Sequence, residues 1–341
     1  MSAARFSPRV PATLDSVAAA AGVSKSTVSR VINGSSQVSP EVLVAVNAAI
    51  AELDYSPNRA ARSLANRQTM AIALVVPEES SRFFGDPYFS AIVHGITHAL
   101  AESDFVLTLQ LASPFEPSEK TIRYLRGGNV DGALVVSHHS GDQFLASLGN
   151  SLPVVFGGRP LRPTELESYY VDVDNVDAAA LGTRYLIERG RTRIATISGP
   201  DDMPAGVDRV AGWTSAMTAA GLDTSRVAAG DFSMASGARA MRQLLEQDAR
   251  LDAVFAASDL MALGAISVLR EHGRSIPGDV AVVGFDDSPA ATGGAIELTS
   301  VHQPSIEMGE KMAQMLLALL RGEQPEQHCI MPTRIVVRDS A

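Results

Sequence analysis

Three short stretches near the start of the chain place apolar residues at helical spacing, and each follows a residue that can cap a helix. The caps are Thr13, Ser24 and Ser39, and Gly22 stands where a tight turn after the first stretch needs a residue without a Cβ. The expected helices cover residues 14–20, residues 25–32 and a stretch that starts at 40. A helix, a glycine turn, a second helix and a supporting third helix predict a helix-turn-helix.

From residue 70 onward, short aliphatic runs alternate with stretches of helical periodicity. The aliphatic runs cover 71–76, 105–111, 133–136, 154–156, 194–197, 253–256 and 280–284. The helical stretches cover 88–102, 175–189, 210–220, 236–247 and 260–272. This alternation predicts parallel, doubly wound sheets whose buried strands are continuous aliphatic runs. This number of strand-helix units is too large for one sheet. We therefore expect two subdomains with a ligand cleft outside the carboxyl ends of their strands.

Charge is unevenly distributed along the chain. Residues 1–67 hold seven Lys and Arg against four acids, a net charge of +3, which leaves −13 for the remainder of a chain whose total is −10. A basic head on an acidic body indicates an anionic partner for the head alone. Cys329 is the single cysteine, no apolar stretch is long enough to span a bilayer, and the first residues lack the apolar region of a secretory signal. We therefore expect a cytoplasmic protein without a membrane partner.

The second expected helix carries the residues suited to reading DNA. Its outward positions are Lys25, Ser26, Ser29 and Arg30, which are short polar or cationic side chains that fit base edges and phosphates. Spacing alone leaves open an ordinary three-helix cap whose polar face meets water, because short motifs have false positives.

Two other classes of protein share parts of this pattern. An enzyme of the doubly wound type would need a phosphate loop, a nucleophile elbow or a glycine fingerprint after its first strand, and the sequence contains none of these motifs. His94 and His98 lie four apart on an expected helix, but a zinc site would need further ligands. An exported solute-binding protein of a transporter would share the body, yet a DNA-binding head stands where its signal peptide should be. We expect a non-enzyme without cofactor or metal.

The head closely resembles the DNA-binding domain of the lac repressor (LacI/GalR) family from Thr13 to Ala65. The matching pieces are T-L-x-x-V-A-x-x-A-G-V-S, T-V-S-R-V-I-N, V-S-P and E-L-x-Y-x-P-N-R-x-A-R-x-L. The resemblance implies that a hinge helix follows the head, folds on DNA and wedges Leu64 into the minor groove, a known way to kink a duplex. A linker leucine that packs on the body is the alternative. The implied DNA-binding residues are Thr13, Leu14, Ser24, Lys25, Ser26, Ser29, Arg30, Asn33, Ser39, Tyr55, Asn58, Leu64 and Ala65.

The resemblance continues through the body, which looks like the periplasmic sugar-binding-protein fold that these regulators carry. Its markers include V-D-G-A-L-V-V, I-A-T-I-S-G-P, A-A-S-D-L-M-A-L-G-A and I-P-G-D-V-A-V-V-G-F-D-D. Within the family the chain looks most like the sugar-responsive regulators of actinobacterial cellobiose and cellulose use. The implied effector site contains Tyr88, Phe89, Arg209, Phe232, Ser258 and Asp286, to which His138 is added because it follows an expected strand end.

Several of these roles have alternatives. His138 and His139 both follow that strand end, so either could reach the ligand, and Phe232 could be plain core because large aromatic residues are usually buried. A sugar suits the set, because a carboxylate and a guanidinium can each bind paired hydroxyls and an aromatic ring can carry the C–H face. The family often has Asn where this chain has Ser258, which leaves the sugar open.

The expected organisation follows from these parts. A flexible basic tail covers 1–12, the helix-turn-helix 13–56, the hinge helix and linker 57–68, and the sensing body 70–337. The N-subdomain is expected at about 70–171 and 303–328, and the C-subdomain at about 172–300 and 330–337. The resemblance implies a homodimer that binds double-stranded operator DNA and is released by a small sugar, cellobiose or a related oligosaccharide, although activation instead of repression stays open. No leucine heptad tail follows Val337, which favours the dimer over a tetramer.

Overall fold

A computed structural model describes residues 12–32, 38–55, 68–112, 119–141, 151–160 and 168–341. The chain divides into two compact units, a head at Met1–Thr69 and a body at Met70–Ala341. The predicted combination of an all-α head with a body of two parallel-sheet subdomains is confirmed. Among the described residues, no helix is long and apolar enough to cross a membrane.

The head consists of three helices around a small apolar core. They are α1 (Leu14–Ala21), α2 (Lys25–Ile32) and α3 (Pro40–Glu52), close to the predicted bounds. Thr13 and Ser16 form a reciprocal capping box at the start of α1, and Gly22 ends that helix in the left-handed region at φ 68°. Ser24 accepts from the backbone N–H of Thr27, as predicted for a cap. The prediction that Ser39 caps α3 is wrong in one respect, because its side chain makes no capping hydrogen bond.

The first sheet of the body is parallel throughout, in the order β11-β5-β4-β3-β1-β2. Its strands are β1 (Ala71–Val76), β2 (Val106–Leu111), β3 (Gly132–Val136), β4 (Val154–Gly157), β5 (Tyr169–Val173) and β11 (His328–Met331). The central strands β1 and β3 are buried along their whole length, as continuous aliphatic runs require when helices cover both faces. We call this sheet with its helices the first subdomain.

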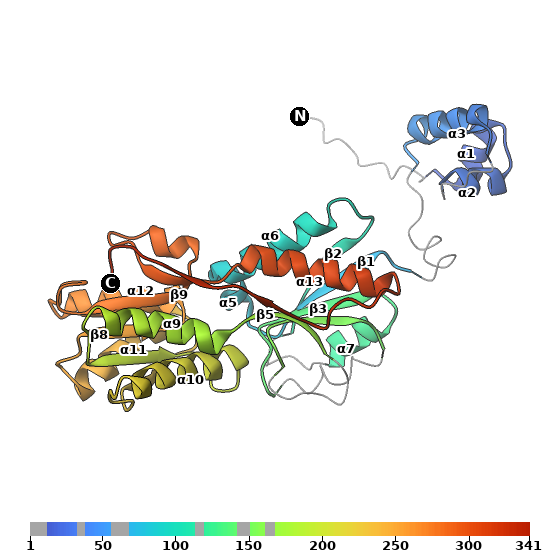
Figure 1. Cartoon of the computed structure of the whole chain (residues 1–341). Coiled ribbons are helices and arrows are strands. Elements are labelled where there is room, and N and C mark those ends of the chain that lie inside the picture. Colours follow the sequence, from blue (N-terminus) through green and yellow to red (C-terminus); the bar gives the residue numbers. More distant parts are fainter. Residues whose placement is uncertain (1–11, 33–37, 56–67, 113–118, 142–150, 161–167) are drawn as a thin grey trace, which may run out of the picture. The chain divides into compact units, whose positions relative to one another are not determined.

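The second sheet has the order β12-β10-β9-β8-β6-β7, with β12 antiparallel to β10 and the other pairs parallel. Its strands are β6 (Ile194–Ser198), β7 (Val227–Ala229), β8 (Ala253–Ala256), β9 (Ala281–Asp286), β10 (Thr299–His302) and β12 (Arg334–Val336). We call this sheet with its helices the second subdomain. The chain therefore crosses between the subdomains after β5, after β10 and between β11 and β12 (Figure 1).

Helices pack on both sheets. The first subdomain carries α5 (Ser80–Gly85), α6 (Pro87–Leu100), α7 (Glu119–Arg126) and α13 (Ser305–Leu320), and the second carries α9 (Asn175–Glu188), α10 (Pro204–Ala219), α11 (Met234–Gln247), α12 (Asp259–Glu271) and the 3-10 turn η1 (Pro289–Thr292). Helices α6 and α13 lie side by side (Figure 1) and cross at reciprocal glycines. A Cβ on Gly95 would stand 1.9 Å from the carbonyl oxygen of Ile306, and one on Gly309 would stand 2.3 Å from that of Ile92.

Two of the expected subdomain boundaries move by two or three residues. Strand β5 continues to Val173, beyond the expected boundary at 171, and β11 extends from His328 to Met331, beyond the expected boundary at 328. Both shifts have one cause, since the residues at each crossing still pair in the first sheet.

Candidate functional site

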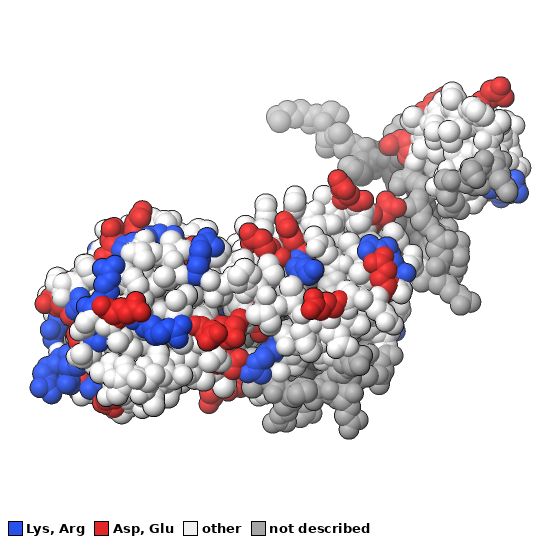
Figure 2. All heavy atoms as spheres, in the orientation of Figure 1, with Lys and Arg blue, Asp and Glu red and all other residues white. Residues whose placement is uncertain are grey.

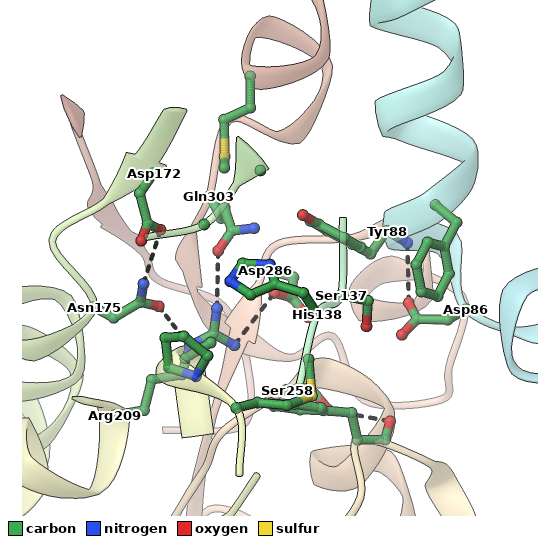
Figure 3. A pocket seen from close by; sticks show the side chains of 18 of the residues that line it. Asp86, Tyr88, Ser137, His138, Asp172, Asn175, Arg209, Ser258, Asp286 and Gln303 are labelled. Carbon is green, nitrogen blue, oxygen red and sulfur yellow. Dashed lines mark hydrogen bonds and ion pairs between the residues drawn. The ribbon is translucent and has the colours of Figure 1, made fainter. Parts of the chain in front are cut away.

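One pocket of the body lies where the carboxyl ends of the two sheets face each other (Figure 3). Its walls come from α5, α10 and α13, from the starts of α6, α9 and α12, from the loops after β3, β4 and β7, and from the ends of β5 and β9. Open parallel sheets bind their ligands at this position. The structure brings all seven predicted effector residues to this pocket: Tyr88, Phe89, His138, Arg209, Phe232, Ser258 and Asp286.

Arg209 on α10 is the centre of the polar network in the pocket and is only 5% exposed. Its guanidinium donates to the side-chain oxygens of Asn175 and Gln303, both at 2.9 Å, and to the carbonyl of Ala257 at 2.7 Å (Figure 3). Asn175 begins α9 directly after the crossing from β5, and Gln303 lies in the crossing between β10 and α13. Arg209 is therefore tied to two of the crossings that join the subdomains.

The guanidinium plane of Arg209 lies on an aromatic ring and beside a carboxylate. Its Cζ is 3.5 Å from the ring centroid of Phe285, and its Nη1 is 3.7 Å from Oδ1 of Asp286. Burial lowers the pKa of Arg209, and the charge of Asp286 opposes this effect. The hydrogen bonds named above use three of the five N–H groups of a guanidinium, which leaves two that can donate to a ligand.

Asp172 on β5 orients Asn175, the residue that accepts a hydrogen bond from Arg209. Its carboxylate accepts from the backbone N–H groups of Arg159 and Val173, each at 2.8 Å, and from the amide of Asn175 at 3.0 Å. The amide nitrogen of Asn175 thus faces Asp172 while its oxygen faces Arg209. Burial raises the pKa of Asp172, and these donors work against that rise.

Asp286 closes the pocket from the end of β9, in an unusual backbone conformation. Its φ is 104° and that of the next residue, Asp287, is 54°, values that only a well-held loop sustains. Asp259 holds this loop, because its carboxylate accepts from the Ser288 backbone at 2.7 Å and from the hydroxyl of Ser300 at 2.6 Å. Burial raises the pKa of Asp286 well above its usual range and that of Asp259 to about 6.

Phe232 meets the pocket from the loop after β7 and is 8% exposed. It has a φ of 65°, and its ring stands directly over Gly199, where a Cβ would lie 2.2 Å from the ring. The guanidinium carbons of Arg82 and Arg209 lie 5.3 Å and 5.8 Å from its centroid. The sequence left open whether Phe232 is a core residue or a pocket residue. It is both, since it packs in the core of the second subdomain and also lines the pocket.

Tyr88 and Phe89 come from the first turn of α6. Asp86 caps this helix by accepting from the Tyr88 backbone at 3.0 Å, which sets the direction of the turn (Figure 3). Phe89 is 1% exposed and packs against Phe83, with ring centroids 5.2 Å apart. Burial raises the pKa of Tyr88, so its phenol stays neutral.

The two adjacent histidines after β3 have different environments. His138 lines the pocket and is 6% exposed. His139 does not line it; its Nδ1 lies 2.9 Å from Asp202 and its Nε2 3.3 Å from Glu78. Because Glu78 belongs to the first subdomain and Asp202 to the second, His139 connects the two.

Three further contacts join the subdomains at the rim of the pocket. Arg159 pairs with Asp208 on α10 through two hydrogen bonds of 2.9 and 2.6 Å. Arg82 on α5 donates to the backbone carbonyl of Asp231, and the Ser140 N–H donates to the carbonyl of Asp202 at 2.8 Å. These contacts, with His139, form what we call the cross-cleft clasp.

Several residues that shape the pocket were not predicted from the sequence, among them Arg82, Asp86, Ser137, Asp172, Asn175 and Gln303. Asp172 lies on a strand that was not predicted. Gln303 lies within a stretch that resembles the family, L-T-S-V-H-Q-P, but its role depends on the crossing after β10, which spacing does not reveal. No metal-binding cluster occurs within the part of the chain that the structure describes.

The structure describes nine of the predicted DNA-binding residues, and six of these nine are exposed on the head. Those that are exposed are Thr13, Ser24, Lys25, Ser26, Arg30 and Ser39, while Leu14 and Ser29 are half-buried. Tyr55 is 9% exposed, and its ring packs in the apolar core of the head. The ammonium of Lys25 pairs with Asp15 at 2.5 Å on the open surface. The remaining four, Asn33, Asn58, Leu64 and Ala65, lie outside the described residues.

Charge on the body is mixed. Figure 2 shows Asp and Glu interspersed with Lys and Arg on the visible face of the body, without a continuous basic surface there. This agrees with the net charge of −13 after residue 67 and leaves the head as the part suited to a polyanion.

A sensor of two α/β subdomains with a pocket between their strand ends, carried on the same chain as a helix-turn-helix, defines a ligand-responsive DNA-binding regulator. Residues 13–58 match the family described as bacterial regulatory proteins, lacI family, and residues 183–341 match the periplasmic binding protein-like domain. The chain is 47% identical over 332 residues to the HTH-type transcriptional regulator CelR of Thermobifida fusca, covering 96% of this chain and 98% of that protein. It therefore belongs to the lacI family of transcriptional regulators.

Other relatives agree with this assignment. The ribose operon repressor of Escherichia coli strain K12 is 33% identical over 331 residues, covering 96% of this chain and 98% of that protein. A complex of the transcriptional regulator CelR with cellobiose superposes with a TM-score of 0.77 at 46% identity, covering 97% of this chain and all of that one. The lac repressor dimer bound to operator and the anti-inducer ONPF gives a TM-score of 0.86 at 28% identity, covering 97% and 99%. These relatives are named as transcriptional regulators or repressors.

Proposed function

We propose that the protein is a cytoplasmic, homodimeric repressor of sugar-utilisation genes that leaves its palindromic operator when cellobiose or a related oligosaccharide occupies the pocket. It acts by binding and not by catalysis, and it needs no cofactor. The observation that carries the proposal is Arg209, a buried guanidinium at the carboxyl ends of both sheets that is held by two of the crossings between them. The similarity to CelR, which forms a complex with cellobiose, supports this choice of sugar.

The lining of the pocket suits a neutral sugar. Arg209 offers donors, while Asp172 and Asp286 offer carboxylate oxygens that accept from hydroxyl groups. The ring of Phe232 offers an apolar surface for the C–H face of a pyranose. Asp86, which also lines the pocket, offers a further carboxylate. The wall is rich in acceptors, which a polyol with many O–H groups can satisfy.

The crossings link sugar binding to the relative position of the subdomains. A sugar that contacts Arg209 and Asp286 from one side and Asp172 from the other favours the closed arrangement of the cleft. By selecting this arrangement, the sugar shifts the population of the body, and it weakens operator binding only as far as it prefers the closed state. Operator DNA must weaken sugar binding by the same factor.

The head reads the operator through α2. We propose that Lys25 and Arg30 contact guanines or phosphates from its exposed face, with Ser26 and Ser29 between them. A homodimer would present two heads to two half-sites. The lac repressor, which is similar in structure, is bound to its operator as a dimer. The hinge wedge at Leu64 remains a prediction from the sequence. A Leu64→Ala variant that kept full operator affinity would remove the wedge from the mechanism.

Ligand-dependent melting of the full chain tests the sugar assignment. A sugar that binds the folded protein at 100 times its Kd stabilises it by about 2.7 kcal/mol. We expect cellobiose to raise the melting temperature, and an unrelated polyol of similar size, such as maltitol, to leave it unchanged. The matched control is Arg209→Ala, which should not respond to cellobiose. No shift of the wild type at millimolar cellobiose would contradict the assignment.

A further inference from the structure

We propose that the pocket selects its effector by charge: it binds the neutral sugar and excludes sugars that carry a phosphate or carboxylate group, and Asp86 is a residue that determines this exclusion. The inference rests on the proposed function and deepens it, because it defines the chemical form in which the sugar acts as a signal. Asp86 directly precedes α6 and lines the pocket (Figure 3).

Carboxylates outnumber cations in the wall of the pocket. The charged side chains among the described lining residues are three acids and two bases, namely Asp86, Asp172, Asp286, Arg82 and Arg209. The other two titratable lining groups are neutral, since burial lowers the pKa of the His138 imidazole to about 4 and raises the pKa of the Tyr88 phenol. Without Asp86, the acids and bases of the wall would be equal in number.

Both cations of the wall already face carboxylates. Nη1 of Arg209 lies 3.7 Å from Oδ1 of Asp286, and Nε of Arg82 lies 3.2 Å from Oε1 of Glu78, which does not line the pocket. Arg209 keeps two N–H groups, which suit the hydroxyl oxygens of a sugar, but its charge is balanced. An anionic group that leaves water needs an unbalanced cation or several free donors to replace its hydration. The wall therefore compensates a neutral ligand and not an anion.

The helix N-termini at the pocket offer little to an anion. The N–H groups of a first helical turn attract negative charge, and phosphate groups often bind there. Here Asp86 caps α6 by accepting from the Tyr88 N–H at 3.0 Å, and Asp174 caps α9. Ser258 caps α12, and α10 begins with Pro204, which has no N–H group. Asp86 thus adds a negative charge and also occupies a donor that an anion would use.

Burial makes a further negative charge unfavourable in this pocket. It raises the pKa of Asp86, Asp172 and Asp286, because each carboxylate is held away from water. An anion beside them either repels them or binds together with a proton. Its affinity, relative to that of a neutral sugar of the same shape, should therefore fall as pH rises. The charged groups at the rim, which do not line the pocket, pair with one another: His139 with Glu78 and Asp202, and Arg159 with Asp208.

The exclusion places the signal in a reaction sequence. A sugar phosphate carries up to two negative charges near neutral pH, and a sugar acid carries one. A reaction that converts the effector into either form would end the signal, although the carbon skeleton stays intact. Hydrolysis of a glycan releases the sugar in its neutral form, so it is the class of reaction that supplies the effector.

The test is calorimetric titration of the full chain with isosteric pairs. A cellobiose derivative with a carboxylate at C6 of the non-reducing ring is compared with its carboxamide, and cellobionate, at the other end, with its amide. Two like charges about 6 Å apart weaken binding by a factor of about 100 at an effective dielectric constant of about 20. Because the two arginines offset part of this repulsion, each acid should bind about 10–100-fold more weakly than its amide at pH 7.5. The ratio should shrink towards pH 5.5.

Asp86→Asn is the central variant, because asparagine also caps helices and only the charge is removed. It should lower the ratio of acid Kd to amide Kd about 10-fold. The matched control is Glu271→Gln, which removes a negative charge from the opposite end of α12 to the pocket and should keep the wild-type ratio. Operator binding without sugar checks that each variant is folded.

The outcomes separate this inference from the proposed function. If the wild type binds acid and amide equally, the inference is wrong and the proposed function stands. A ratio that Asp86→Asn leaves unchanged would remove Asp86 from the selection. If cellobiose binds but neither amide does, shape and not charge excludes these sugars, which also overturns the inference. If the wild type binds no cellobiose at all, the proposed function itself fails.

Discussion

Removing the charge from His139 should destabilise the body at neutral pH and have no effect at pH 10. Glu78 and Asp202 both contact this ring, and the hydrogen bond to Glu78 is the largest cause that raises the pKa of His139 from 6.5 to about 9. A pKa that is raised on folding stabilises the protein fully below the unfolded pKa, and this stabilisation is lost as pH rises through the folded pKa. The relevant window therefore runs from about pH 6.5 to about pH 9.

The size of the effect follows from the shift. Each pKa unit corresponds to about 1.4 kcal/mol, so the shift of the His139 pKa from 6.5 to about 9 sets an upper bound of about 3–4 kcal/mol. Its side chain is 22% exposed and that of Asp202 is 48% exposed, so solvent screening reduces the figure to about 1–2 kcal/mol. For a body of this size, that corresponds to a change in melting temperature of about 2–6 °C.

The assay is thermal unfolding of the wild type and His139→Gln between pH 6 and 10. Lysines and tyrosines also titrate at high pH, and the variant subtracts their contribution because it shares them. The melting temperatures should differ by about 2–6 °C at pH 6.5 and converge by pH 10. A difference that stays constant across this range would mean that packing, and not the charge of His139, stabilises the clasp.

Three other changes test separate parts of the account. Arg209→Ala should leave operator affinity intact and abolish the response to cellobiose, measured by fluorescence anisotropy of labelled operator; normal release would remove it from the site. Gly95→Ala forces a Cβ to within 1.9 Å of the Ile306 carbonyl, so α6 and α13 must separate, and denaturant unfolding should show a loss of about 3 kcal/mol. Lys25→Ala should weaken binding to the operator more than to random DNA, and an equal loss on both would make Lys25 a phosphate contact.

The long buried elements were predictable because their pattern is local. Strands such as β1 and β8 are continuous aliphatic runs, and both lie within one residue of their predicted bounds. Strands β7, with three residues, and β11, with alternating exposed positions, carry too little apolar signal to be found. Helix α13 does carry an amphipathic pattern, so this helix was predictable from the sequence.

Some residues of the candidate site were predictable from the sequence, and others were not. The residues around Arg209 and Asp286 fall in stretches whose resemblance to the family is specific. The partners across the cleft were not predictable, because Asp202 and Asp208 reach their positions only through the arrangement of the two sheets. Which histidine faces the pocket also depended on structure, since adjacent residues at a strand end point to different sides.

The central claim is that sugar and operator bind with opposite preferences through the two states of the body. Fluorescence anisotropy of labelled operator DNA, titrated with the full chain at zero and at saturating cellobiose, measures this coupling directly. We predict that cellobiose raises the Kd for operator about 5–150-fold, the usual range of allosteric coupling. An unchanged Kd, at a cellobiose concentration that calorimetry shows to saturate the pocket, would contradict the account.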